Sequence, residues 1–239
     1  MSTVSEPPTP HRVAIYYAPP AGSVAWEAGS RWLGRCAYKN QARPQTVIEG
    51  IPPEDFARLS AEPRRYGWHG TLKAPFRLAD GQSLDTLRAA LQALCAGRAP
   101  FELGPLQVSR LGDFLALQPA QRVPALDALA ADCVQQLQPL AKPLDADELA
   151  RRRRAVLSPE QDKLLQAWGY PYVLHQFRFH LSLTGSLAEL PQDSVARLQQ
   201  AAAAHFAALP PWHVDRLSLF VEPTPGAPLR LLEQIGFAP

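Results

Sequence analysis

The chain has 239 residues, of which 46% are hydrophobic and 19% are charged, and its formal net charge is +2. These values are ordinary for a globular protein, and so small a charge identifies no anionic partner by itself. No apolar stretch reaches the ~20 residues that cross a bilayer, which excludes a membrane-spanning helix. We therefore expect a cytoplasmic protein with no membrane partner.

The first ten residues and the cysteines set further limits. Residues 1–10 lack the basic and apolar regions of a secretory signal, and their Pro, Ser and Thr content predicts a flexible tail. The remaining residues, 11–239, are expected to form one domain. The three cysteines include no C-x-x-C pair, so a disulfide framework or a cysteine zinc site is not expected.

Strands and helices alternate along the first half of the chain. The patterns predict a strand at 12–17, helices at 24–33 and 53–59, a strand at 69–78, a helix at 83–95 and a hairpin formed by 101–108 and 114–117. Ser83 is the expected N-cap of its helix, and Gly97 lies just beyond the end. Pro75 must lie at an edge or a bulge, because proline cannot donate a ladder hydrogen bond.

The second half begins with helices and returns to strands. Helical spacing covers 123–140 and 145–167, the latter broken at Ser158-Pro159. A strand at 177–183, a helix at 192–209 and strands at 214–221 and 229–234 complete the predicted elements.

The order strand, helix, hairpin occurs twice. The strand around Val108 follows His69 by 39 residues, and Leu219 follows His180 by the same interval. This repetition suggests a duplicated chain, although residue identity between the halves is weak. Two α+β lobes related by a pseudo-two-fold axis would then place equivalent strands face to face.

Each half opens with the same four-residue pattern, His69-Gly70-Thr71-Leu72 and His180-Leu181-Ser182-Leu183. In a strand, side chains at i and i+2 project from one face. His69 therefore shares a face with Thr71 and Lys73. His180 likewise shares a face with Arg178, Ser182 and Thr184. Each strand thus offers an imidazole, hydroxyls and a cation.

This combination suits phosphodiester cleavage. The reaction needs a base that accepts a proton from the attacking oxygen and an acid that protonates the departing oxygen. Histidine, with an unperturbed pKa of ~6.5, supplies both forms near neutral pH. Hydroxyl and cationic donors stabilise the charge on the non-bridging oxygens. A single strand histidine is usually structural, but two copies in corresponding positions favour an acid–base pair.

The paired motifs resemble the signature of the two-histidine (2H) phosphoesterase superfamily. Further similarity is to the branch encoded beside carbon–phosphorus lyase genes, whose members are labelled phosphonate metabolism proteins. The segments that carry it are 65–76, 148–153, 168–173 and 177–185, with 14–19 and 32–35 also fitting. The resemblance covers about residues 12–235, nearly the whole chain.

The resemblance implies an α+β fold of the 2H phosphoesterase type, bilobal and duplicated, with two antiparallel sheets facing a central cleft and helices outside. It also implies metal-independent chemistry without a cofactor, and catalytic roles for His69, Thr71, His180 and Ser182. By analogy with the superfamily, His180 is expected as the base and His69 as the acid. Ser182 replaces the commoner threonine and keeps the hydroxyl.

The remaining candidate residues bind phosphate or substrate. Lys73, Arg178 and Thr184 follow from strand alternation, Tyr16 from its place in the first strand, and Arg65 from its position just before the first motif. The run Arg151–Arg154 follows acidic residues on a helix, which favours surface ion pairs over a nucleic-acid patch. The other histidines show no metal-ligand spacing.

The expected function is hydrolysis of a cyclic or linear phosphodiester of a small molecule. A phosphorylated ribose from phosphonate breakdown is suggested by the family association alone. One alternative is a 2′,3′-cyclic phosphodiesterase acting on RNA ends, which requires a basic path and stacking aromatic residues. Another is a catalytically silent module that binds phosphate or nucleotide. The sequence leaves the natural substrate and the oligomeric state open.

Overall fold

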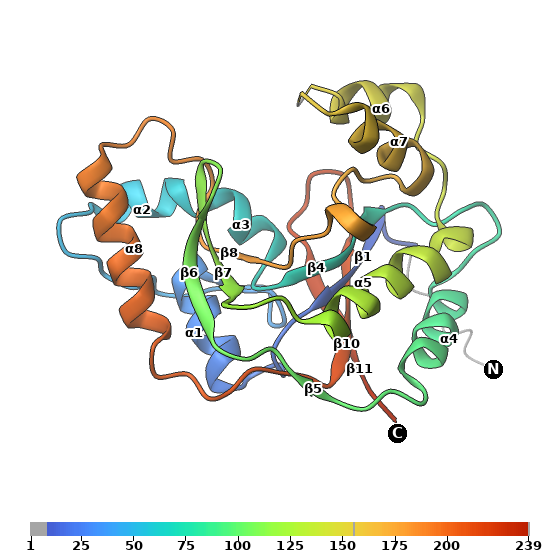
Figure 1. Cartoon of the computed structure of the whole chain (residues 1–239), viewed down its shortest axis with the longest axis horizontal. Coiled ribbons are helices and arrows are strands. Elements are labelled where there is room, and N and C mark those ends of the chain that lie inside the picture. Colours follow the sequence, from blue (N-terminus) through green and yellow to red (C-terminus); the bar gives the residue numbers. More distant parts are fainter. Residues whose placement is uncertain (1–8, 155, 239) are drawn as a thin grey trace, which may run out of the picture.

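A seven-stranded antiparallel sheet organises the protein (Figure 1), seen in a computed structural model that describes residues 9–154 and 156–238. The expected tail at 1–10 therefore lies almost wholly outside the described residues. The strands run in the order β11-β10-β1-β4-β8-β7-β6. They are β1 (Arg12–Tyr17), β4 (Gly70–Phe76), β6 (Leu106–Leu111), β7 (Phe114–Pro119), β8 (Leu181–Ser182), β10 (Arg216–Glu222) and β11 (Arg230–Gly236). The predicted α+β class and antiparallel pairing are confirmed.

Helices and short strand pairs surround this sheet. The helices are α1 (Val24–Leu33), α2 (Pro53–Leu59), α3 (Ala61–Tyr66), α4 (Leu84–Cys95), α5 (Pro124–Gln136), α6 (Ala146–Arg152), α7 (Pro159–Trp168) and α8 (Gln192–Phe206). The short pairs are β2 (Arg35–Cys36) with β3 (Gln41–Ala42), and β5 (Phe101–Glu102) with β9 (His213–Val214). None of the helices in the described part of the chain is long and apolar enough to cross a membrane.

The two halves of the chain exchange elements. Strand β4 comes from the first half but joins β10 and β11 of the second half through β1, and helix α4 of the first half contacts β10 and β11 directly. Conversely, β8 and α8 come from the second half but pack with β6 and β7 of the first. Strands β4 and β8 then pair with each other, so the strands form one continuous sheet where two antiparallel sheets were expected. Each lobe therefore contains a histidine strand from one half and a hairpin from the other.

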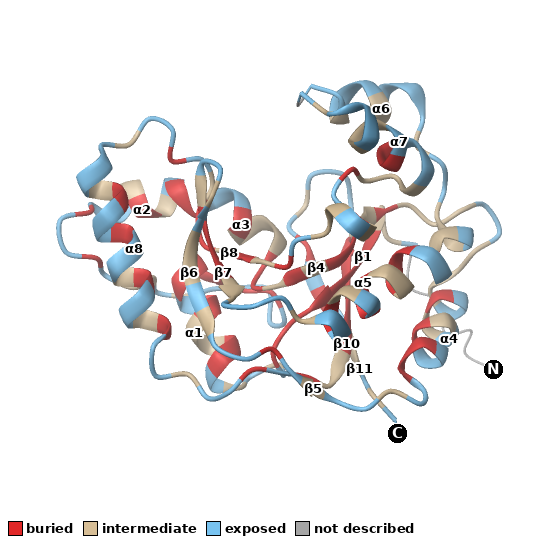
Figure 2. Ribbon diagram, viewed as in Figure 1, coloured by how far each residue is buried: buried red, intermediate tan, exposed pale blue. Residues whose placement is uncertain are grey.

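Many residues of the central strands are buried and appear red in the ribbon of Figure 2, and their side chains belong to two separate core clusters. Ile15 and Leu72 belong to the main core on one face. Tyr16 and Phe220 belong to a smaller cluster that also contains Trp26. Alternation along β1 thus sends neighbouring side chains into two different cores, as the two-residue period of a strand requires.

Local sequence signals mark the helix ends. Ser83 and Ser158 each form a capping box with the residue three positions later, Thr86 and Gln161. Gly34 ends α1 with φ of 80°, a left-handed conformation that glycine adopts without steric cost. The predicted break between α6 and α7 is confirmed. The strand predicted at 177–183 is wrong in extent, because only residues 181–182 pair with neighbours.

Substitution of Leu181 tests how much the junction between the two groups of strands contributes to stability. Its side chain is fully buried, and its backbone lies between Gly70 of β4 and Leu117 of β7. We expect Leu181→Ala to lower the free energy of unfolding by about 2–5 kcal/mol, the usual cost of such a cavity. Urea denaturation measures this change. The exposed Leu232 provides the control, and an equal effect of Leu232→Ala would contradict a special role for the junction.

Candidate active site

Both motif histidines line one cavity of about 350 Å³. Its walls come from β4, β8, the start of β7 and the segments around α3 and α7. The lining residues include Tyr16, Glu62, Tyr66, His69, Thr71, Asp113, Phe114, Tyr170, His180, Ser182 and Thr184. The structure therefore brings together two residues that are 111 positions apart in the chain.

The pairing of β4 with β8 explains this convergence. Gly70 pairs with Leu181, and the strands are antiparallel. His69 immediately precedes β4 and His180 immediately precedes β8, so each histidine lies next to one member of this pair. Both rings line the same cavity, and His180 is close enough to lower the pKa of His69.

Each imidazole is oriented by a backbone carbonyl two residues earlier. The Nδ1 atom of His69 lies 2.8 Å from the oxygen of Gly67, and that of His180 lies 2.8 Å from the oxygen of Arg178. Because a carbonyl only accepts, both Nδ1 atoms carry a hydrogen. This leaves Nε2 as the ring nitrogen available to a ligand in each case. Gly67 presents its carbonyl from a left-handed conformation with φ of 83°, which favours glycine.

Burial makes both rings hard to protonate. The pKa of His69 is lowered to about 4, mainly by burial and to a smaller extent by nearby His180, although the hydrogen bond to Gly67 opposes the shift. The pKa of His180 is also lowered, mainly by burial. His69 is thus neutral at pH 7 without a ligand. Its predicted role as the acid, which remains a prediction, requires a bound anion to raise that pKa.

Hydroxyl groups surround the two rings. The Thr71 hydroxyl lies 3.2 Å from His69 Nε2 and can donate to it while the ring is neutral. Ser182 is paired with Ala116 of β7 and lines the same cavity. The Thr184 oxygen accepts a hydrogen bond from the Leu115 amide at 3.0 Å. Thr184 is therefore a buried wall residue whose hydroxyl is already engaged with β7.

Tyr16 packs against the ring of His69. Its ring stacks on the imidazole with a centroid distance of 3.8 Å and an interplanar angle of 29°. It pairs with Thr71 on one side and Ser218 on the other, so the strand register determines this contact. Burial raises the pKa of the Tyr16 phenol well above its usual range, which keeps it protonated. Whether it binds phosphate remains a prediction.

Strand alternation places Lys73 wrongly. Tyr16 pairs with Thr71, but its neighbour Ile15 pairs with Lys73, so β4 contains one extra residue at this point. Such a bulge reverses the alternation and turns Lys73 to the face that carries Ile15. Its ammonium donates to Val134 O at 3.2 Å and to Gln138 Oε1 at 2.9 Å, outside the histidine cavity. A second register shift in β4 lies beside Pro75, as predicted.

The two predicted arginines also lie outside this cavity. Arg178 is exposed, because residues 177–180 form no strand and do not follow strand alternation. Arg65 binds the buried carboxylate of Glu222 at 2.8 Å, which Arg12 also contacts, and lies 5.6 Å from the ring centre of Tyr66. Arg65 therefore contacts the ring of Tyr66, which lines the cavity, without lining the cavity itself.

Sequence reasoning missed the aromatic walls of the cavity. Tyr66 ends α3, Phe114 begins β7 at 5.6 Å from the His180 ring centre, and Tyr170 follows α7. The acids Glu62 and Asp113 also line it, and no lysine or arginine does so among the described lining residues. Tyr66 could have been suspected from its position three residues before His69. Tyr170 lies in the segment 168–173 that carries the family resemblance, but local pattern gave it no place in the site, because a long-range contact brings it here.

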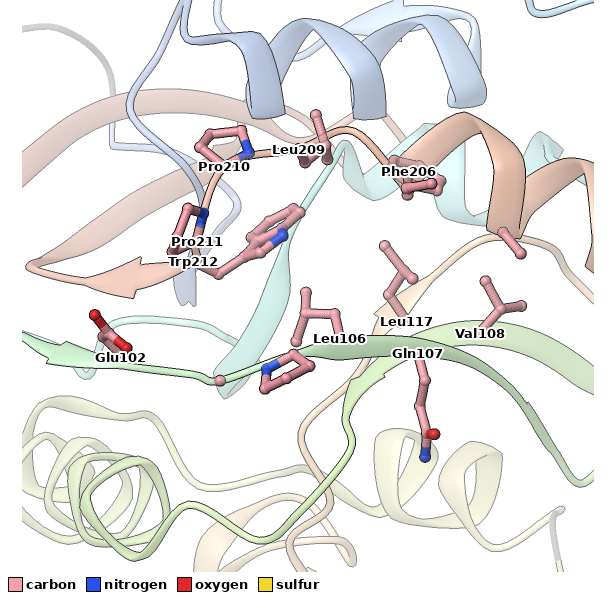
Figure 3. Close-up of a pocket in the computed structure, with 14 residues that line it drawn as sticks. Glu102, Leu106, Gln107, Val108, Leu117, Phe206, Leu209, Pro210, Pro211 and Trp212 are labelled. Atoms are coloured by element: carbon pink, nitrogen blue, oxygen red, sulfur yellow. The ribbon is translucent and has the colours of Figure 1, made fainter.

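A larger cavity of about 650 Å³ lies elsewhere, between β6 and the segment after α8 (Figure 3). Its walls are mainly apolar, with Leu106, Phe206 and Trp212 facing inward, and it contains neither motif histidine. If size alone were the criterion, this cavity would be the candidate active site. The histidine cavity is the better candidate, because it contains titratable side chains and hydroxyl groups. Across residues 9–154 and 156–238, no group of three His, Cys, Asp or Glu side chains could hold a metal ion.

Arginines of the run Arg151–Arg154 make ion pairs. Arg151 contacts Glu148 at 3.5 Å, and Arg153 contacts Asp162 at 2.6 Å. Arg152 instead turns inward and donates to the carbonyl of Gly169 at 2.6 Å. The predicted pairing with the preceding acids of the same helix is thus seen for Arg151, whereas Arg153 pairs with an acid of α7.

The lowered pKa of His69 links the site to folding stability. In the unfolded chain the pKa returns to about 6.5, so between about pH 6.5 and 4 the unfolded state binds more protons. The free energy of unfolding should therefore fall as the pH is lowered through this window. Urea denaturation at pH 7 and about pH 5 should show a smaller fall for His69→Gln than for the parent protein. An equal fall in both would contradict the shift, and exposed His175→Gln is the control.

Comparison with known proteins identifies two curated relatives of the chain. A protein of Janthinobacterium sp. (strain Marseille), named ribose 1,5-bisphosphate phosphokinase PhnN, is 40% identical over 230 residues, which are 95% of this chain and 51% of that protein. The protein of the same name from Laribacter hongkongensis (strain HLHK9) is 40% identical over 221 residues, covering 92% and 50%. The chain thus spans about half the length of these curated relatives.

Solved structures similar to the chain include E. coli LigT complexed with 3′-AMP, with 15% identity, a TM-score of 0.44 and coverage of 96% of this chain and 99% of that one. Another, described as a phosphoesterase, has 16% identity and a TM-score of 0.42 over 96% and 99%. The family model described as "Protein of unknown function (DUF1045)" matches residues 71–230, and the chain belongs to that family.

Proposed function

We propose that the protein is a metal-independent phosphoesterase that hydrolyses a phosphodiester by two-histidine acid–base catalysis. The observation that carries this proposal is the shared orientation of His69 and His180. Each donates Nδ1–H to a carbonyl, and each leaves Nε2 for a ligand in one cavity. A binding module needs hydrogen-bond donors but gains nothing from two such groups, which favours the enzyme over a silent module.

The proposed reaction is a hydrolysis in which one histidine accepts a proton and the other histidine donates one. One histidine accepts a proton from water as the water oxygen bonds to phosphorus. The other histidine donates a proton to the ester oxygen as its bond to phosphorus breaks. Hydroxyls of Thr71 and Ser182 donate to the non-bridging oxygens, where charge accumulates. The assignment of His180 as base and His69 as acid is part of this proposal.

A phosphorylated ribose is the proposed substrate class. The relatives that share half their length with this chain are named for a kinase that acts on ribose 1,5-bisphosphate. The present sequence contains no Gly-Lys pair, which the P-loop motif of many such kinases requires. We infer that the shared half performs a different step. Opening a 1,2-cyclic phosphate of ribose 5-phosphate at O2 would yield ribose 1,5-bisphosphate, the substrate in that name.

Substitution of the histidines tests the chemistry. We expect His69→Gln and His180→Gln each to lower kcat on ribose 1,2-cyclic phosphate 5-phosphate by about 10²–10⁴, the usual contribution of general acid–base catalysis. Phosphorus NMR, which distinguishes the cyclic diester from the phosphomonoester product, measures turnover, with a chelator present throughout. His175→Gln is the matched control, since His175 is exposed and lies outside the cavity. Full activity in either cavity variant would refute the proposal.

The same assay separates the alternative substrates. If RNA ends carrying a 2′,3′-cyclic phosphate are the true substrates, they should be hydrolysed faster than the ribose compound. Their turnover should also fall steeply with added salt, because contacts to nucleic-acid phosphates are salt-dependent. Loss of all turnover in chelator would instead point to metal-dependent chemistry.

A further inference from the structure

A second, smaller cavity adjoins the histidine cavity. It has a volume of about 150 Å³, and Ala74, Pro75 and Tyr170 line both spaces. Its other walls come from β4, the end of α5 and the α6–α7 segment, which stands apart from the sheet at the top of Figure 1. A molecule held by the histidines would therefore lie beside this second space.

The smaller cavity is lined by cations. Lys73, Lys142 and Arg152 face it, and no aspartate or glutamate is among its described lining residues. The Lys73 side chain belongs to a residue that is only 3% exposed. Within the described ranges, no carboxylate lies within 4.0 Å of Lys73 or Arg152. Two largely buried cations thus share one space without a neutralising partner.

Neutral oxygens hold these cations in place but do not use all their donors. Lys73 donates to Val134 O and Gln138 Oε1, which accounts for two of its three hydrogens. Arg152 donates to Gly169 O at 2.6 Å and to Pro75 O at 3.4 Å, which accounts for two of five. Both groups therefore keep hydrogens for a further acceptor.

The electrostatics favour an anion in this space. Burial lowers the pKa of Lys73 to about 8 and also lowers that of Arg152. Nearby Glu148 raises the pKa of Arg152 in part, but its carboxylate is bonded to Arg77 at 2.5 Å. An unpaired buried charge is costly, and an anion between the two cations would relieve that cost. The histidine cavity is different, since it contains Glu62 and Asp113 instead.

We propose that the cavity formed by Lys73, Lys142 and Arg152 binds a second phosphate group of the substrate, a terminal phosphomonoester. This inference rests on the proposed function, because it assumes that the scissile phosphate lies between the histidines. A phosphoryl group fits a space of this size, whereas a nucleoside does not. The site would select sugar bisphosphates over diesters that carry a single phosphate.

Binding of ribose 5-phosphate tests the site without any turnover. Calorimetry on a His69→Gln/His180→Gln protein reports binding away from the intact histidine pair. We expect Arg152→Gln in that background to weaken the Kd at least tenfold and Arg152→Lys, which keeps the charge, to restore part of it. Arg153→Gln is the matched control, since Arg153 is the next residue, is exposed and pairs with Asp162. Its Kd should change less than twofold.

A second variant guards against misfolding. Arg152 bonds two backbone carbonyls, so its loss could lower the Tm by itself. Lys142 is exposed, pairs with Asp80 at 2.9 Å and faces the same cavity. Lys142→Gln should keep the Tm of the parent protein and weaken the Kd two- to fivefold. An unchanged Kd in both Arg152→Gln and Lys142→Gln would overturn the proposal, as would no binding by the double-histidine background.

Turnover separates this inference from the proposed function. Ribose 1,2-cyclic phosphate with and without the 5-phosphate should differ at least tenfold in kcat/KM, and Arg152→Gln should reduce that ratio. Equal turnover of the two compounds would overturn the second phosphate site and leave the two-histidine chemistry intact. Binding of ribose 5-phosphate without turnover of either compound would support the site and refute the proposed function.

Discussion

The pairing of β4 with β8 is the constraint on which the rest of the site depends. A single backbone pair, Gly70 with Leu181, joins the two groups of strands into one sheet. The same pair brings together the two motifs, whose residues His69, Thr71, His180 and Ser182 all line one cavity. A slip by one residue would turn every one of these side chains to the opposite face. This pairing also requires a glycine at position 70, because a Cβ atom there would lie only 2.4 Å from the Phe179 ring.

The exchange of elements between halves makes the site a property of the whole chain. The His69 strand packs with β10 through β1, and the His180 strand packs with β7. Neither half alone contains a histidine strand together with the hairpin that supports it. A substitution that disturbs the packing of one hairpin should therefore change the position of the histidine that comes from the other half of the chain.

Much of this arrangement follows from local patterns in the sequence, and the failures have identifiable causes. Capping residues such as Ser83 and Ser158 act within one turn of helix, so the sequence predicts them well. The convergence of the histidines follows from the repeated motif and from strand pairing. Lys73 was misplaced because a bulge depends on how β1 and β4 pair, which strand alternation does not contain. Tyr170 was missed as a wall residue because α6 and α7 approach the site only through tertiary contacts.

The position of Lys73 shows that the cations and the histidines lie in two separate, adjoining cavities. Strand alternation would have given the phosphodiester a cation beside the histidines, whereas the bulge moves that cation into the neighbouring cavity. The histidine cavity is left with hydroxyls, aromatic walls and two acids, a setting in which imidazoles stay neutral until an anion arrives. Fixed positive charge beside the histidines would lower their pKa further and oppose protonation of the catalytic acid. In the proposed reaction, separating the cations from the two histidines would let the cation-lined cavity bind a negatively charged group while the histidines transfer protons.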